Sequence, residues 1–310
     1  MEYRKMGRTG LKLSEVSLGG WLTFGGQLDD ETSFAILNKA VDLGVNFIDL
    51  ADVYARGNAE RVVGRWLKGK KRSDFVISSK VYWPMSDNVN DRGLSRKHIM
   101  ESIEGSLKRL GVDYLDIYFC HRFDEETPVE EVVLAMTDLV RQGKILYWGT
   151  SVWEADQIED AVELARHWLG YQPFVEQPRY NMLDRHIEDA IMPMCAEKGL
   201  GLVVWSPLAQ GVLTTKYLDG IPEGSRATYS HWIKEDLTPE NIERVKKLNA
   251  LAGDLGLTMP QLALAWILRR PEISSVIVGA SRPEQLEENV KASGVRLSDD
   301  VLEEIERILA

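Results

Sequence analysis

Asn46-Phe47-Ile48-Asp49-Leu50-Ala51-Asp52-Val53-Tyr54 is a short apolar run that ends at a carboxylate, and a turn at Arg56-Gly57-Asn58-Ala59-Glu60 follows it. Tyr54 stands five positions beyond Asp49. If the run is a strand of a parallel β/α barrel, both side chains lie at the carboxyl end of that strand, where the active sites of such barrels form. The stretch therefore predicts a strand that brings a carboxylate and a phenol to one rim of the fold.

Seven further short apolar runs have the same strand-like character and alternate with long segments of helical period. With the opening run, the predicted strands are 15–18, 46–50, 75–79, 114–120, 145–149, 174–176, 202–205 and 275–278. The predicted helices are 30–43, 59–69, 95–110, 129–142, 154–169, 185–198, 239–255, 259–269, 283–292 and 298–309. Such alternation gives either an open doubly wound sheet or a closed eightfold barrel, and eight strands favour an α/β fold of the (β/α)8 TIM barrel type.

The ends and connections of the chain complete this fold. Residues 2–14 alternate in polarity around a glycine-containing turn, which predicts an N-terminal β-hairpin that covers one end of the fold. The last predicted helices add to the C-terminal side, and no linker divides the chain, so we expect residues 1–310 to form a single domain. Residues 206–238 are too many for a plain strand-to-helix connection and predict a lid or ligand loop.

Particular residues are expected to start and stop the helices. Ser95 and the pair Thr127-Pro128 stand where two helices should begin. Five glycines stand where helices should end, and these are Gly44, Gly111, Gly143, Gly170 and Gly199.

Composition excludes several classes of protein. The chain of 310 residues has 44% hydrophobic residues and a formal net charge of −11 without a basic block, so nucleic acid is not expected as a partner. Cys120 and Cys195 form no C-x-x-C pair and fit buried free thiols in a reducing compartment. No apolar run approaches a membrane span and the start lacks a signal-peptide pattern, so we expect a cytoplasmic protein without membrane insertion. The five histidines form no ligand cluster, and no metal site is predicted.

Four residues that could carry chemistry follow three successive predicted strands. Asp49 ends the second strand, Lys80 follows the third, His121 follows the fourth, and Tyr54 lies in the loop after Asp49. Taken singly, each is better explained as a turn, surface or core residue, but strand ends of a barrel meet at one rim and bring all four together. We expect Lys80 to lower the pKa of Tyr54, Asp49 to hold the lysine, and His121 to orient a substrate carbonyl.

A nucleotide site is suggested by other strand ends. No G-x-G-x-x-G pattern follows a strand, which argues against a Rossmann site. The stretch 279–289 after the last strand is either a capping box of Ser281 with Glu284 or a phosphate site at a helix N-terminus, with Arg282 adding a cation. Trp205 could stack on a flat heterocycle, and Ser151 and Gln177 could hold an amide.

These motifs together resemble the aldo-keto reductase family. Asp49-Leu50-Ala51-Asp52-Val53-Tyr54 resembles its D-x-A-x-x-Y motif, Lys80 and His121 stand where the family keeps its lysine and histidine, and 279–289 is similar to its cofactor-phosphate segment. The resemblance covers essentially the whole chain. Four stretches are similar to the branch that contains the potassium-channel β-subunits and their bacterial relatives, and these are 21–27, 92–99, 147–151 and 205–209.

The resemblance implies a barrel that binds NADPH or NADP in extended form. Tyr54 would be the proton donor, tuned by Lys80 and Asp49, with His121 beside the carbonyl. The cofactor contacts it implies are Gly20, Trp21, Gln27, Asp49, Ser151, Gln177, Trp205, Ser206, Pro207, Leu208, Gly211, Lys216, Arg226, Gly279, Ser281, Arg282, Gln285, Glu288 and Asn289. Among these, Trp205 would stack on the nicotinamide, and Ser151 and Gln177 would bind its carboxamide.

Two departures from the family pattern bear on function. Channel β-subunits usually have Asn where this chain has His121, which supports catalytic competence. Many members have Arg where Gln285 stands, and Asn or Arg where Val152 stands, so contact with the cofactor 2′-phosphate would depend more on Arg226 and Arg282.

Two functions follow from the resemblance. The first is an NADPH-dependent reductase of aldehydes or ketones, which would bind a small-molecule carbonyl substrate. The second, less favoured, is a redox-sensing regulatory subunit with slow turnover that docks on a membrane channel or another partner. The relatives imply a homo-oligomer, a tetramer. Trp21, Tyr82, Trp83 and Trp232 indicate a pocket suited to aromatic or apolar carbonyls.

Overall fold

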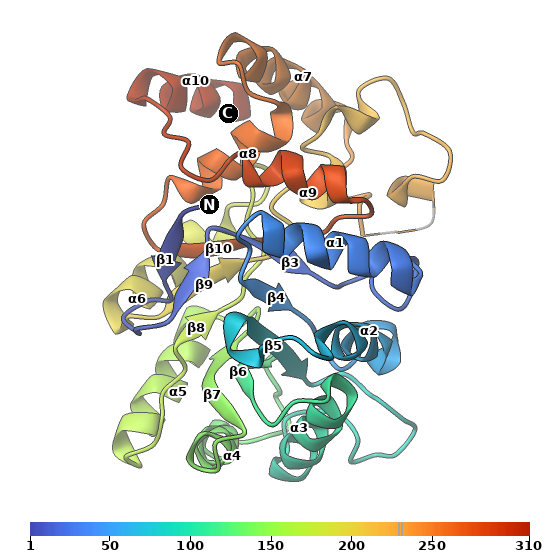
Figure 1. The fold of residues 1–310 in the computed structure, drawn as a ribbon. Coiled ribbons are helices and arrows are strands. Elements are labelled where there is room, and N and C mark those ends of the chain that lie inside the picture. Colours follow the sequence, from blue (N-terminus) through green and yellow to red (C-terminus); the bar gives the residue numbers. More distant parts are fainter. Residues whose placement is uncertain (229, 231) are drawn as a thin grey trace.

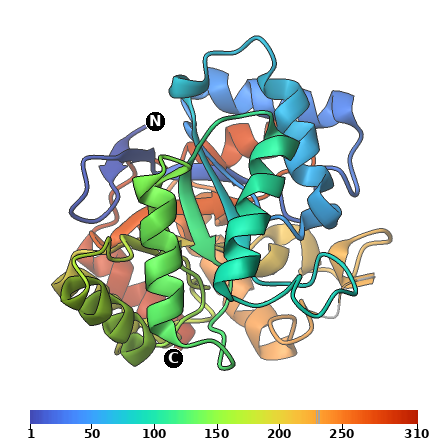
Figure 2. The same cartoon turned by 90° about the horizontal axis from the view of Figure 1, so that it is seen from below.

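The fold is a closed barrel of eight parallel strands with helices outside it (Figure 1, Figure 2). The computed structural model describes residues 1–228, 230 and 232–310. The barrel strands, in sequence, are β3 (Val16–Gly19), β4 (Phe47–Asp49), β5 (Val76–Val81), β6 (Leu115–Cys120), β7 (Ile145–Thr150), β8 (Val175–Glu176), β9 (Gly201–Val204) and β10 (Ile273–Val278). Around the barrel their order is β10-β3-β4-β5-β6-β7-β8-β9. The predicted (β/α)8 barrel and its eight strands are confirmed.

Helices follow the strands as the periodicity predicts. They are α1 (Asp30–Asp42), α2 (Asn58–Leu67), α3 (Arg96–Leu110), α4 (Val129–Arg141), α5 (Ala155–His167), α6 (Ile191–Lys198), α7 (Pro239–Asp254), α8 (Met259–Leu268), α9 (Pro283–Val290) and α10 (Asp299–Leu309). In the described part of the chain no single helix is long and apolar enough to cross a membrane, and only α7 and α8 taken together, bent by 89°, reach that length and composition.

One predicted helix boundary is wrong. The helix expected over 185–198 begins only at Ile191, because His186–Glu188 forms a separate 3-10 turn. Gly170 does not supply the left-handed residue after α5, since Leu169 takes that conformation with φ 50°. A Cβ on Gly170 would come within 2.7 Å of the Thr137 hydroxyl, so this glycine is required by close packing.

The predicted hairpin is confirmed and closes the amino-terminal end of the barrel. β1 (Tyr3–Lys5) pairs antiparallel with β2 (Lys12–Ser14). Met6 and Leu13 of this hairpin are fully buried among the side chains inside the barrel, including Phe47, Phe119 and Val203. The hairpin therefore plugs one end, so we expect ligands to bind at the other, where the carboxyl ends of the strands lie.

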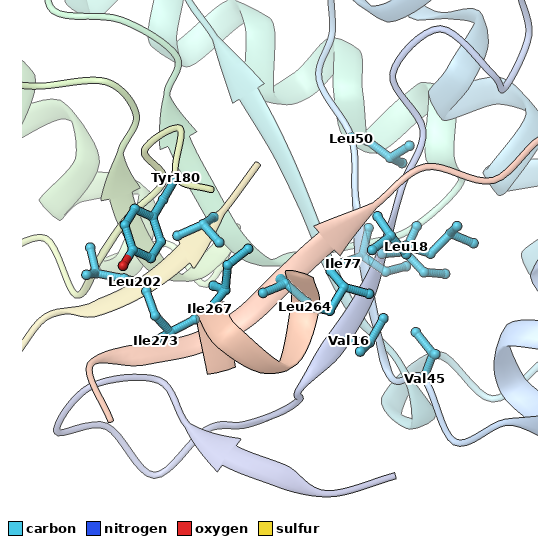
Figure 3. Close-up of a cluster of buried hydrophobic side chains, with 14 of the residues drawn as sticks. Val16, Leu18, Val45, Leu50, Ile77, Tyr180, Leu202, Leu264, Ile267 and Ile273 are labelled. Atoms are coloured by element: carbon cyan, nitrogen blue, oxygen red, sulfur yellow. The ribbon is translucent and has the colours of Figure 1, made fainter. Parts of the chain in front are cut away.

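A second apolar layer lies between the barrel and its helices. Outward-facing strand residues such as Val16 and Leu202 are buried, and they belong to the same core as Leu264 and Ile267 of α8 (Figure 3). Both faces of the strands are thus largely buried, as expected for a parallel sheet that helices cover, and Leu146 of β7 is an exposed exception. This packing fixes the strand register, and the register decides which polar side chains point inward.

The long connection between β9 and α7 has little regular structure. It contains three short 3-10 turns at Ala209–Gly211, Thr215–Tyr217 and Arg226–Thr228. Tyr229 and His231 of the predicted lid or ligand loop lie outside the described residues. Its role as a lid stays a prediction.

Candidate active site

Alternation along the strands places the candidate residues inside the barrel. Phe47, Val76 and Phe119 line the interior core. Side chains two positions further along a strand face the same way, so Asp49 and His121 follow their apolar neighbours toward the carboxyl-end mouth. The pairing of Asp49 with Ser78 and of Lys80 with Phe119 aligns β4, β5 and β6 at this level. The three strands therefore deliver polar groups to one place.

Lys80 stands at the centre of this group. Its Nζ donates to Asp49 Oδ2 at 2.6 Å, to the Leu50 carbonyl at 2.7 Å and to Tyr54 Oη at 3.2 Å. The Lys80 side chain is fully buried. All three ammonium protons are therefore used, and the lysine connects the carboxylate to the phenol.

Asp49 is held from two further directions. Ser78 Oγ and Gln177 Nε2 both donate to Asp49 Oδ1, at 2.7 and 2.9 Å. A buried charge is tolerated only when it is paired and hydrogen-bonded, and Asp49 meets both conditions. The carboxylate therefore has one orientation, which in turn orients the lysine.

The pKa of Tyr54 is shifted upward, whereas the sequence analysis predicts a downward shift. Burial raises the pKa of Tyr54 well above its ordinary value, and the negative charge of Asp49 raises it further, whereas the charge of Arg122 lowers it. The predicted lowering by Lys80 is wrong, because the Asp49 carboxylate neutralises that ammonium and burial disfavours the phenolate. The phenol therefore stays protonated at neutral pH.

The hydrogen bond from Lys80 also orients the phenolic proton. Tyr54 Oη accepts from Lys80, so one lone pair is occupied and the O–H must point elsewhere. Among the described residues the phenolic proton has no acceptor. A proton donor that is held in place but not hydrogen-bonded to the protein is suited to a ligand oxygen.

His121 is a neutral imidazole next to the phenol. Its ring centroid lies 5.9 Å from that of Tyr54, with the planes at 77°. Burial and the positive charges of Lys80 and Arg122 hold the pKa of His121 well below its ordinary value. Its Nδ1 is buried and has no hydrogen-bond partner in the described part of the chain. Since the neutral ring can donate one hydrogen bond, it can bind a carbonyl oxygen without carrying a charge.

Hydrogen bonds and close packing hold the turn that carries Tyr54. The Asp52 carboxylate accepts from the Val53 amide at 2.6 Å and from Ser102 Oγ at 2.8 Å. The next turn needs Gly57, because it has φ 80° and an added Cβ would lie 2.6 Å from Arg109 Cδ. These contacts fix the backbone on which the phenol sits.

Backbone strain gathers around the same mouth. Eight described residues other than glycine have positive φ, and seven of them lie in loops that follow β3, β4, β7 and β9: Leu22, Ala55, Arg56, Val152, Ser206, Ala209 and Gln210. Residues in this conformation are disfavoured and tend to collect at functional sites. This signal is independent of the titratable groups and points to the same end of the barrel.

The residues that are expected to contact a nicotinamide lie at the ends of neighbouring strands. β7 pairs with β8 and β8 with β9, so Ser151, Gln177 and Trp205 follow one another along the mouth. Ser151 Oγ donates to the Gln177 carbonyl at 2.9 Å. The Trp205 ring lies 6.4 Å from the Trp21 ring in an edge-to-face arrangement. A flat ring, an amide and a hydroxyl thus stand next to the Asp49–Lys80 pair.

The segment after β10 is built differently from the predicted capping box. Ser281 Oγ and the Ser281 amide both donate to Gln285 Oε1, at 3.1 and 2.8 Å, and Arg282 occupies the cap position of α9. The expected pairing of Ser281 with Glu284 is therefore wrong, because Gln285 reaches back to Ser281 instead. The Arg282 side chain is exposed, 3.9 Å from Glu284.

Glu288 and Asn289 are less accessible to a cofactor than the sequence suggested. Glu288 Oε1 accepts from Gln261 Nε2 at 2.9 Å, and Asn289 is almost fully buried. Gly279, at the start of the segment, is exposed and has no heavy atom within 4 Å of an added Cβ. The segment is therefore open on the β10 side and packed against α8 on the other.

The remaining predicted cofactor residues lie on two loops at the mouth. Gly20 is buried and its amide donates to the Asp49 carbonyl at 2.9 Å, while Gln27 lies in an exposed turn of the same loop. The other loop follows β9 and carries Ser206, Pro207, Leu208, Gly211, Lys216 and Arg226. The Arg226 guanidinium lies 5.9 Å from the Trp21 ring and so links the two loops.

Two residues of the group were missed from the sequence. Ser78 donates a hydrogen bond to Asp49. It lies two residues before Lys80 on a predicted strand, so its side chain could have been expected to face the same way as that of Lys80. Arg122 follows His121 directly, and its Nη1 donates to the His121 carbonyl at 2.5 Å. Nothing in the local sequence distinguished this arginine from a surface residue.

In the described residues no group of three or more His, Cys, Asp or Glu side chains is arranged to hold a metal ion. Cys120 and Cys195 are both buried and unpaired.

Comparison with known proteins agrees with the fold and the motifs. Residues 15–310 match the model of the aldo/keto reductase family. A probable voltage-gated potassium channel subunit beta from Oryza sativa subsp. japonica is 45% identical over all of this chain and 97% of its own length. A protein with the same description from Arabidopsis thaliana is 46% identical with the same coverage. A putative voltage-gated potassium channel subunit beta from Schizosaccharomyces pombe is 45% identical over 99% of this chain and 93% of its own length.

A (β/α)8 barrel with a linked Asp, Lys and Tyr at its mouth belongs to the class of barrel oxidoreductases. The chain is a member of the aldo/keto reductase family, and the three relatives named above are described as probable or putative voltage-gated potassium channel β-subunits.

Proposed function

We propose that this protein is an NADPH-dependent reductase of aldehydes or ketones, in which Tyr54 donates the proton to the carbonyl oxygen. One observation carries the proposal. The Lys80 ammonium lies 2.6 Å from Asp49 and 3.2 Å from Tyr54 Oη, inside the mouth of the barrel. We also propose that residues 1–310 form a single domain. The protein would act in the cytoplasm as a homo-oligomer, a tetramer.

The residues at the mouth fit a nicotinamide cofactor. Trp205 offers a flat face for the ring, and Ser151 and Gln177 offer a hydroxyl and an amide for its carboxamide. Lys216, Arg226 and Arg282 are cations on the β9 and β10 side, where the phosphates of an extended dinucleotide would lie. When bound, the reduced cofactor supplies hydride to the carbonyl carbon.

The chain's own groups supply the proton and the orientation. The neutral His121 and the Tyr54 hydroxyl would both donate to the carbonyl oxygen and polarise it. As negative charge develops on that oxygen it becomes a far stronger base than a phenolate, so Tyr54 gives up its proton despite its raised pKa. Lys80 would keep its hydrogen bond to the oxygen of the phenolate that remains, and Asp49 keeps Lys80 in position.

Replacing Tyr54 by Phe tests the proton donor. Reduction of benzaldehyde with NADPH should fall by about 10²-fold or more, the usual contribution of a general acid, while NADPH affinity from fluorescence titration stays within about twofold. NADH is titrated in parallel to measure the preference between the two cofactors. Tyr114→Phe, at the opposite end of the barrel, is the matched control and should keep the full rate. An unchanged rate in Tyr54→Phe would remove the acid role from this residue.

A regulatory role is the second candidate. The relatives are named as channel β-subunits, and this supports a protein that docks on a channel and turns over slowly. The two functions separate in one pair of measurements, namely capture of the chain by a channel cytoplasmic domain and steady-state turnover on an aldehyde panel. Efficient turnover without capture would exclude the regulatory role.

A further inference from the structure

Arg122 lies directly beside the candidate catalytic groups. It follows β6 and His121, and its Nη1 donates to the His121 carbonyl at 2.5 Å. Its guanidinium carbon lies 5.6 Å from the centre of the Trp83 ring, and that ring lies 6.3 Å from the His121 ring. The arginine therefore belongs to the same wall of the mouth as the imidazole.

The charge of Arg122 reaches the reacting groups. It contributes to the lowered pKa of His121 and of Lys80, and it opposes the raised pKa of Tyr54. The Arg122 side chain is half-buried, and this partial withdrawal from water lowers the pKa of Arg122. A charge in this position is costly unless an opposite charge compensates it.

Arg122 has no ion-pair partner among the described residues. Lys80, by contrast, is paired with Asp49. The acid whose charge acts on Arg122 is Glu176, but its oxygens already accept from Thr150 Oγ1 at 2.5 Å and from the Val152 amide at 2.7 Å. Burial also raises the pKa of Glu176 to about 7, so this carboxyl is only partly ionised at neutral pH. The guanidinium is thus left with uncompensated charge.

The strand order separates Arg122 from the cofactor phosphates. In the closed barrel β6 stands opposite β10, which carries the predicted phosphate segment 279–289. Lys216 and Arg226 lie after β9, next to β10. An anion that binds Arg122 therefore belongs to the substrate rather than to the extended dinucleotide.

We propose that the carbonyl substrate carries a carboxylate and that Arg122 binds this carboxylate while Tyr54 and His121 hold the carbonyl oxygen. The planar fork of the guanidinium suits a carboxylate in two-point contact. Trp83 supplies an apolar surface beside it, so an aromatic or short aliphatic oxo acid fits the site. This inference rests on the proposed reductase function and narrows its substrate class.

The test compares two aldehydes of nearly the same shape, para-carboxybenzaldehyde and its neutral amide, para-carbamoylbenzaldehyde. The measured quantity is the ratio of their kcat/KM values with NADPH. The natural chain should favour the carboxylate by about tenfold or more, the strength expected of one charged hydrogen bond. Arg122→Gln should reduce this ratio by about tenfold and Arg122→Lys by less. Raised salt should reduce the ratio in the natural chain but not in Arg122→Gln.

Arg166→Gln serves as the matched control, because Arg166 is an exposed arginine on α5. It should leave the ratio unchanged. A ratio near one in the natural chain, or equal losses for both aldehydes in Arg122→Gln, would overturn the assignment while leaving the reductase function standing. If neither these aldehydes nor simple neutral ones are reduced, the reductase function fails and the substrate assignment fails with it.

Discussion

Removing the ammonium of Lys80 should destabilise the fold as well as the chemistry. Lys80→Met keeps the length of the side chain but deletes the group that bonds Asp49, the Leu50 carbonyl and Tyr54. Asp49 is then a carboxylate with 3% residue exposure that keeps only the bonds from Ser78 and Gln177. Breaking a buried ion pair on one side costs about 3–5 kcal/mol, because an uncompensated charge is left behind.

A matched double variant separates this charge effect from lost packing. Asp49→Asn combined with Lys80→Met removes both charges and keeps both shapes. Since the penalty in the single variant comes from the charge left on Asp49, the double variant should regain at least about 2 kcal/mol of the loss.

Urea unfolding followed by tryptophan fluorescence measures the effect, since the chain has nine tryptophans. The single variant should shift the midpoint downward at an unchanged m-value. A loss below about 1 kcal/mol in Lys80→Met, or a double variant less stable than the single one, would contradict the charge argument.

Two further predictions concern buried or strained residues near the mouth. Burial and the charge of Glu60 raise the pKa of Asp52 from 3.8 to about 7, so its contribution to stability is present below about pH 4 and is lost as the pH rises through 7. Asp52→Asn should therefore stabilise the fold more at pH 8 than at pH 5, and a gain that does not depend on pH would contradict this. Val152 has φ 58°, which is disfavoured for a β-branched residue, so Val152→Asn should raise stability by about 1 kcal/mol in thermal unfolding. The same change at Val41, an exposed helical position, should bring no gain.

The order of strands and helices was predictable from local pattern. Alternating apolar runs and helical segments mark the strands and helices, because each must bury a face against its neighbours. The hairpin was predictable for the same reason. The role of Gly170 was not predictable locally, since this glycine is required by the nearby Thr137 and not by the end of its own helix.

The candidate site was only partly predictable. Asp49, Lys80 and His121 stand at strand ends, and a closed barrel necessarily brings such ends to one rim. The sequence could not tell that Gln177 bonds Asp49 or that Arg122 lacks an acidic partner, because both depend on which side chains meet across the mouth. The direction of the Tyr54 pKa shift also depended on burial.

The sequence by itself determined the barrel, its hairpin and the residue types at the carboxyl-end mouth, because periodicity and strand ends are local properties. Only the tertiary structure decided the charge balance there. The lysine charge is cancelled by Asp49, the phenol is kept protonated by burial, and Arg122 is left uncompensated, since desolvation and pairing depend on groups far apart in the chain and close in space.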